Sequence, residues 1–62
     1  MTEDEAYTLG DQDGFDDGFD GIQIYNSFNA NVPPQLRSVY RSAYQRGYDD
    51  GVEAYRRMIE NR

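Results

Sequence analysis

The sequence predicts an all-α protein in which two helices pack against each other through rows of alanine and glycine, with a structured connecting loop. Two observations support this fold class. Apolar and small residues recur with a period of 3.6 in the C-terminal half. A pattern Ala-x-x-x-Gly-x-x-x-Gly also occurs once in each half. We expect a single small domain over 1–62, with a helix over about 3–19, a loop over 20–33 and a helix over about 34–61.

The C-terminal half has the stronger helical pattern. A Pro-Pro pair precedes it, and proline is tolerated in the first turn of a helix while disfavouring helix before it. One narrow row on the predicted helix is formed by Ala43, Gly47, Gly51 and Ala54. A glycine inside a helix costs about 1 kcal/mol relative to alanine, so the row predicts close approach of another helix. Tyrosines flank the row: Tyr40, Tyr44, Tyr48 and Tyr55.

The N-terminal helix has good end signals and a poor interior. Thr2 and Glu5 fit a capping box, and Gly21 is placed to end the helix. Three glycines and a run of aspartates lower the helical propensity, so packing has to supply the stability. One face is expected to hold the apolar residues together with glycine: Tyr7, Gly14, Phe15, Gly18, Phe19 and Ile22.

The connecting loop contains several apolar residues. Residues 22–25 alternate briefly like a strand, but a single short strand has nothing to pair with. We expect four side chains to fold back as a lid on the helix pair: Ile24, Tyr25, Phe28 and Val32. We expect most aromatic residues to pack in the core. An exposed subset among four of them is the alternative anchor for a partner: Tyr25, Phe28, Tyr40 and Tyr55.

The internal repeat can be aligned in two registers. In the first, Ala6-Gly10-Gly14 aligns with Ala43-Gly47-Gly51; in the second, residues 14–19 align with residues 47–52. Both keep the four-residue spacing of glycine, so the sequence leaves the register open.

The glycine pattern resembles that of the ribosome modulation factor family, whose members pair two helices. The resemblance includes the first register and, loosely, Asn26-Ser27-Phe28, where the family tends to have Asn-Pro-Tyr. It implies a helical pair. Family members are basic and bind ribosomal RNA surfaces, whereas this chain has a net charge of −6. Ribosome association is therefore the alternative function.

The composition disfavours catalysis and cofactor binding. The chain has no histidine and no cysteine, so the common general bases, nucleophiles and zinc ligands are absent. We therefore expect no enzyme activity and no cofactor. The N-terminal residues are acidic and no apolar stretch approaches the roughly 20 residues of a membrane span. These features predict a cytoplasmic protein (in the host cytoplasm if phage-encoded) that does not bind membranes.

The charge is distributed unevenly. Residues 1–31 contain eight acidic and no basic residues, whereas residues 32–62 contain four acidic residues and six arginines. Direct nucleic-acid binding needs basic residues that release counterions, so the acidic half disfavours it. An acidic surface instead attracts a basic partner. Glu53 and Arg57 are spaced for an ordinary helical ion pair.

The aspartates of the first helix are predicted to form an acidic face. Asp13, Asp16 and Asp17 are expected opposite the aromatic residues, with Asp20 just beyond. Acids three or four residues apart lie about 4.5–6 Å apart along a helix, roughly comparable with one charge per ~3.4 Å along a nucleic-acid strand. The predicted partner-binding set is Asp13, Asp16, Asp17, Asp20, Asp49, Asp50 and Glu53. The set predicts a nucleic-acid mimic; an ordinary solvated face is the plain alternative.

In size and charge the chain resembles small phage-encoded anti-CRISPR proteins, several of which resemble nucleic acid. This likeness implies a basic protein surface as partner, with a CRISPR effector complex as the candidate because its DNA channel is basic. The oligomeric state is left open.

Calcium binding is a further alternative. Residues 11–20 combine closely spaced aspartates with glycine, as calcium loops do. The spacing departs from an EF-hand, because Ile22 occupies the position of the bidentate glutamate.

Overall fold

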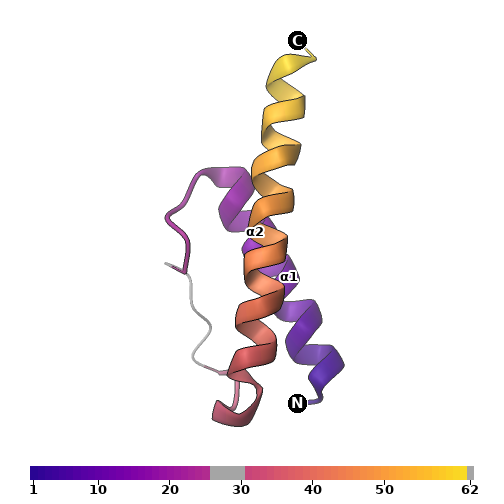
Figure 1. Ribbon diagram of the computed structural model, residues 1–62, viewed down its shortest axis with the longest axis vertical. Coiled ribbons are helices and arrows are strands. Elements are labelled where there is room, and N and C mark those ends of the chain that lie inside the picture. Colours follow the sequence, from indigo (N-terminus) through magenta and orange to yellow (C-terminus); the bar gives the residue numbers. More distant parts are fainter. Residues whose placement is uncertain (26–30, 62) are drawn as a thin grey trace.

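The computed structural model, which describes residues 1–25 and 31–61, confirms the all-α fold class (Figure 1). Helix α1 spans Glu3–Asp20, a 3-10 turn η1 spans Pro34–Leu36, and helix α2 spans Arg37–Glu60. No strand occurs in the described part of the chain. The Cα positions extend over 42 × 20 × 12 Å, so the helix pair is a flat rod.

Both ends of α1 form as the sequence predicts. The Glu5 amide donates to the Thr2 hydroxyl and the Thr2 amide donates to the Glu5 carboxylate, each at 3.1 Å, which completes the capping box. Gly21 adopts a left-handed conformation with φ of 72°. The amide of Ile22 then donates to the carbonyl oxygen of Asp17 at 2.9 Å, which closes the last turn of the helix.

Glycine brings the two helix backbones into direct contact. Three glycines of α1 lie against carbonyl oxygens of α2, and two glycines of α2 lie against carbonyl oxygens of α1. The facing pairs are Gly10–Tyr40, Gly14–Tyr44, Gly18–Tyr48, Gly47–Asp11 and Gly51–Phe15. A Cβ added at Gly14 would lie 2.9 Å from the Tyr44 Cα, closer than real Cβ atoms approach. No residue other than glycine fits there without moving the helices apart.

The two helices run in the same direction. Residue numbers rise together along the facing pairs, and Figure 1 shows both helices ascending, with α1 crossing behind α2. A short connection between helices normally gives an antiparallel pair. Here the connection has to return along the pair to begin α2 beside the start of α1. The sequence did not predict this direction.

The contacts decide between the two registers of the internal repeat. In the second register, Gly14 corresponds to Gly47 and Asp11 corresponds to Tyr44. The contact of Gly14 with Tyr44 therefore corresponds to the contact of Gly47 with Asp11, and both occur. The second register is thus the structural one, and an approximate two-fold axis parallel to the helices relates α1 to α2.

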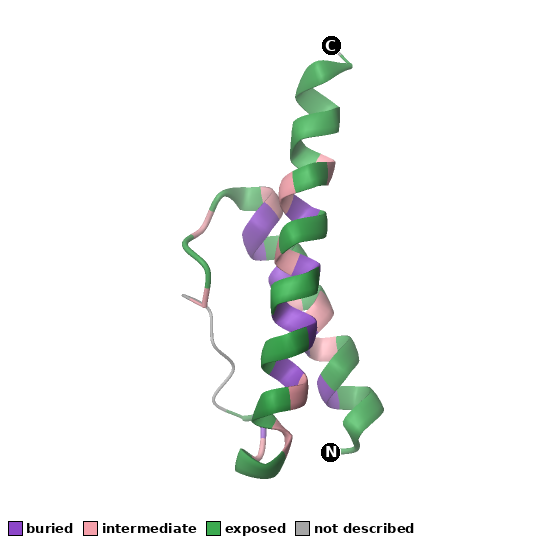
Figure 2. Cartoon of the chain, in the orientation of Figure 1, coloured by how far each residue is buried: buried purple, intermediate pink, exposed green. Residues whose placement is uncertain are grey.

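The core is small and lies on one side of the helix pair. Ala6, Val32, Tyr40, Ala43 and Tyr44 are each at most 1% exposed, and buried segments face each other across the helices in Figure 2. The last turns of α2 project beyond α1 and are exposed (Figure 2).

The predicted lid is confirmed in part. Val32 is fully buried and Tyr25 stacks on Tyr44 with ring centroids 5.2 Å apart. Ile24 is 38% exposed, so its predicted packing is wrong. Phe28 lies outside the described residues.

The predicted apolar face of α1 is also wrong in part. Tyr7 and Phe15 are each 39% exposed, although they were expected on the packed face with the glycines. The reason is the backbone contact: it leaves no room between the helices for large side chains, so these rings lie at the edge.

Replacing Gly14 by alanine is expected to lower the free energy of unfolding by about 2 kcal/mol or more, because overpacking outweighs the gain in helical propensity. Urea denaturation followed by circular dichroism measures this. Ser42→Ala, at an exposed position of α2, is the control and should leave stability unchanged or slightly raised. A Gly14→Ala variant as stable as the wild type would contradict the backbone contact.

Candidate protein-binding surface

The structure divides the seven carboxylates predicted to bind a partner. Asp17 is buried and Asp13 is half-buried. The other five are exposed: Asp16, Asp20, Asp49, Asp50 and Glu53. Asp13 and Asp17 lie across the helix from Phe15, as the helical spacing predicts, but the expectation that they form part of an exposed acidic face is wrong. The Asp17 side chain is buried in the helix pair, and the Asp13 side chain is half-buried.

A row of tyrosines on α2 explains why. The hydroxyl of Tyr40 donates to the carboxylate of Asp13 at 2.7 Å, and the hydroxyl of Tyr44 donates to the carboxylate of Asp17. The two tyrosines are four residues apart on α2, and the two aspartates are four residues apart on α1. Because the helices are parallel and have the same rise per residue, each tyrosine lies opposite one aspartate. Asp17 is only 5% exposed, so its hydrogen bond satisfies a carboxylate that water hardly reaches. Asp13 and Asp17 thus have a structural role.

The connection covers this side of the helix pair, which we call the covered face. The Tyr48 hydroxyl donates to the carbonyl oxygen of Ile22 at 2.6 Å, and the Tyr25 amide donates to the Tyr44 hydroxyl at 3.1 Å. The Arg41 guanidinium lies 5.1 Å from the centroid of the Tyr25 ring. Tyr25 has a φ of 64°, which is uncommon for an aromatic residue, and these contacts hold it there.

The Tyr44 hydroxyl is held as a permanent donor. Burial, and secondly the hydrogen bond to Asp17, raise the pKa of Tyr44 well above its usual value of 10.0. The hydrogen bond from the Tyr25 amide opposes this shift without reversing it. The Tyr44 hydroxyl of the folded protein therefore stays protonated at neutral pH and remains able to donate its hydrogen bond.

The exposed carboxylates form two matching pairs. Asp16 and Asp20 of α1 correspond, in the register of the repeat, to Asp49 and Glu53 of α2, and all four are exposed. Members of a pair are one turn apart, about 6 Å along the axis. Glu53 also accepts from Arg57 at 2.6 Å, as its spacing predicts, but both side chains are largely exposed and the ion pair contributes little stability.

A hydrogen bond on the other side of the helix pair mirrors one on the covered face. Arg46 donates to the Tyr7 hydroxyl at 2.9 Å. In the register of the repeat, Arg46 corresponds to Asp13 and Tyr7 corresponds to Tyr40. Equivalent positions of the repeat are therefore hydrogen-bonded on both sides of the helix pair. Tyr40 donates on the covered face, whereas Tyr7 accepts on the other side.

Sequence reasoning named Tyr55 as a candidate exposed aromatic residue, but it missed the partly exposed aromatic strip that Tyr55 forms with Phe15 and Phe19, and it wrongly included Tyr40, which is buried. Phe15 and Phe19 stack with centroids 6.2 Å apart, and Phe19 meets Tyr55 edge to face at 5.7 Å. Phe15 is 39% and Tyr55 is 44% exposed. We call these three residues the open strip. Their sequence signal was a helical apolar spacing, which does not distinguish a buried face from an exposed one.

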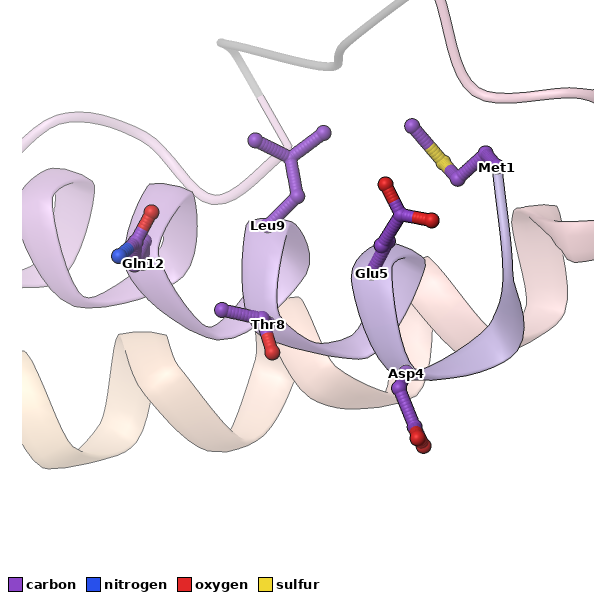
Figure 3. Close-up of a pocket in the computed structure, with 6 residues that line it drawn as sticks. All are labelled: Met1, Asp4, Glu5, Thr8, Leu9 and Gln12. Carbon is purple, nitrogen blue, oxygen red and sulfur yellow. The ribbon is translucent and has the colours of Figure 1, made fainter.

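A hollow of about 440 Å³ lies along the first turns of α1 (Figure 3). The side chains of Met1, Glu5 and Leu9 lie on one side of the helix in Figure 3, and Asp4 points to the other. Glu5 is already engaged in the capping box. Four of its lining residues are polar, namely Asp4, Glu5, Thr8 and Gln12, but Asp4 points away from Glu5, so these groups do not converge as they do in small-molecule sites.

The calcium alternative is not supported by the geometry. Glu3–Asp20 is helical throughout, which distributes the aspartates around the axis, whereas a calcium loop wraps them around one point. Within residues 1–25 and 31–61, no three acidic, histidine or cysteine side chains converge to hold a metal ion.

No family model, curated protein or solved structure matches the chain. The resemblances to the ribosome modulation factor family and to anti-CRISPR proteins therefore stay predictions. In the described part of the chain, neither helix has the length and apolar character needed to cross a membrane.

Replacing Tyr44 by phenylalanine is expected to lower the free energy of unfolding by about 2 kcal/mol, because the buried Asp17 loses its donor. Tyr40→Phe is the matched control. It should cost about 1 kcal/mol or less, since water can reach the half-buried Asp13. Equal losses in urea denaturation would show that burial of the carboxylate does not matter.

Stability is expected to fall as the pH rises above 10. The unfolded chain releases the Tyr44 proton near its usual pKa of 10.0, whereas the folded protein retains it. The free energy of unfolding should therefore decrease by up to about 1.4 kcal/mol per pH unit. Tyr44→Phe should reduce this slope in denaturation curves recorded from pH 8 to pH 11 (about three units). An unchanged slope in the variant would assign it to another group.

Proposed function

We propose that this chain is an acidic binding protein that occupies the basic groove of a nucleic-acid-handling protein and excludes the nucleic acid from it. The observation that supports this proposal is the repetition of exposed carboxylates at equivalent positions of two parallel, tightly packed helices: Asp16, Asp20, Asp49 and Glu53. Asp50 adds a further exposed charge.

Rigidity makes these charges useful for recognition. We call Asp16 with Asp20, and Asp49 with Glu53, the two acidic rows. The backbones of α1 and α2 touch at five glycines, so the distance between these rows varies little. A partner that grips regularly spaced phosphates can then meet carboxylates at regular intervals without first ordering them. The acidic rows take the place of phosphates in this proposal.

The charge distribution favours a protein partner over a nucleic acid. Helix α1 contains eight acidic residues and no basic residue. Such a surface repels phosphate and speeds the encounter with a basic surface. Exposed charges are screened over about 8 Å at physiological ionic strength, so the affinity should fall with added salt.

A CRISPR effector complex is the candidate target. Its heteroduplex and displaced strand are held by positively charged channels. A rod of 42 × 20 × 12 Å, measured over Cα atoms, is elongated enough to lie along such a channel. The resemblance in size and charge to anti-CRISPR proteins is the second reason for proposing this target.

The test is competition for DNA. Purified CRISPR effector complexes are mixed with labelled target duplex and the full chain, and bound DNA is measured by gel shift. The wild type should displace the DNA, and D16N/D20N/D49N/D50N should lose at least about tenfold in affinity, since several charge contacts are removed. The control is E3Q/D4N/E5Q/E60Q, which removes the same charge elsewhere and keeps a residue able to form the capping box.

Two outcomes would contradict the proposal. In one, the wild type displaces DNA from no complex and instead co-sediments with ribosomes, as the alternative function requires. In the other, both quadruple variants lose affinity equally, which would mean that only net charge matters and that the acidic rows are not recognised.

A further inference from the structure

We propose that the open strip of Phe15, Phe19 and Tyr55 is a docking site for a non-helical, basic segment of the partner protein. Apolar side chains of that segment would pack on the three rings. Its arginine or lysine side chains would face the aspartates beside them on α1: Asp11, Asp16 and Asp20.

The covered face indicates what kind of chain fits. By the repeat, Phe15 corresponds to Tyr48, and Asp11 corresponds to Tyr44. On the covered face, Tyr44 and Tyr48 are covered by the protein's own connection: Ile22 accepts a hydrogen bond from Tyr48, and Tyr25 stacks on Tyr44. Ile22 and Tyr25 lie outside any helix or strand. The equivalent row on the open side has no such cover in the described part of the chain, so a non-helical segment is the kind of occupant that the fold already accommodates.

Two hollows border the open strip and differ in character. A hollow of about 380 Å³ extends from Phe15 to Asp13, which accepts from Tyr40 on the covered face, and is lined mainly by acidic and polar groups: Asp11, Gln12, Asp13 and Asp16. A hollow of about 470 Å³ beside Phe19 and Tyr55 is lined mainly by apolar groups and glycine, together with Asp20: Gly18, Gly21, Tyr48 and Val52. A segment that places a basic side chain in the first and an apolar one in the second would match both.

Charge selects a basic partner over a second copy of the chain. Asp11 stands where the covered face has the neutral Tyr44, and Arg46 on this side donates to Tyr7. A second copy has a net charge of −6 and would bring more carboxylates against these aspartates. Like charges brought together oppose association, whereas arginine or lysine would neutralise them.

This inference deepens the proposed function and rests on it for the positive charge of the partner. The acidic rows would supply attraction, and the open strip would supply an apolar anchor. Buried aromatic anchors contribute much of the affinity in protein interfaces, whereas exposed charges chiefly speed the encounter.

The test is an NMR titration of the full, isotopically labelled chain with two short synthetic peptides. One alternates arginine with leucine and tyrosine; the other has glutamate in place of arginine. The arginine peptide should shift the amide signals of residues 15–20 and of Tyr55, and the glutamate peptide should not. Phe15→Ser with Phe19→Ser should weaken binding at least about tenfold, as loss of an anchor does.

Further variants keep the test sharp. Met58→Ser with Ile59→Ser removes two exposed apolar residues outside the strip and should leave binding unchanged. If the phenylalanine variant loses helix content by circular dichroism, Asp11→Asn with Asp16→Asn tests the same site and should also weaken binding of the arginine peptide.

Several results would overturn the docking site: no shifts with the arginine peptide, equal binding of both peptides, shifts centred away from the strip, or a dimer in sedimentation whose contacts cover it. The proposed function fails separately. If the peptide binds the strip but the chain displaces DNA from no effector complex, the docking site stands and the function falls. If DNA is displaced equally well by the phenylalanine variant, the function stands and the docking site falls.

Discussion

The contact between two helix backbones at glycine is the constraint on which the rest of this structure depends. Five glycines face carbonyl oxygens of the opposite helix, and a side chain at any of them would separate the helices. Such close approach increases van der Waals contact along the pair, which matters in a chain whose core contains few large side chains. The helices in contact run parallel, and Ile22 and Tyr25 of the connection cover one side of the pair, whereas the other side has no such cover in the described part of the chain.

The same constraint decides the role of each carboxylate. With the backbones in contact, tyrosines of α2 reach across to α1, and Asp13 and Asp17 become hydrogen-bond acceptors of Tyr40 and Tyr44. An unpaired buried carboxylate would be costly, so this pairing is a condition of the fold. The acids that point away from the contact remain available to a partner. One aspartate run, Asp16-Asp17, thus contains both a surface charge and a structural one.

The charge of α1 links stability to binding. Acids in its first turn, Glu3, Asp4 and Glu5, interact favourably with the helix dipole, but its last turn has no basic residue and includes Asp20. Eight like charges on one helix repel each other. A basic partner would relieve that repulsion at the same time as it made contacts. The acidic composition that weakens the isolated helix therefore favours association with positive surfaces.

The sequence by itself determined the two helices, their end signals and their contact through glycine, because capping residues and 3.6-residue periodicity act locally. It also determined the acidic character of the surface. Only the tertiary structure decided the parallel direction, the register of the repeat, and which of Asp13, Asp16 and Asp17 remain exposed. The physical reason is that a helical wheel fixes the angle between side chains but not which flank the partner helix and the connection cover. Phe15 and Tyr44 each have another aromatic residue four positions away in the sequence. Phe15 is nevertheless exposed, whereas Tyr44 is fully buried.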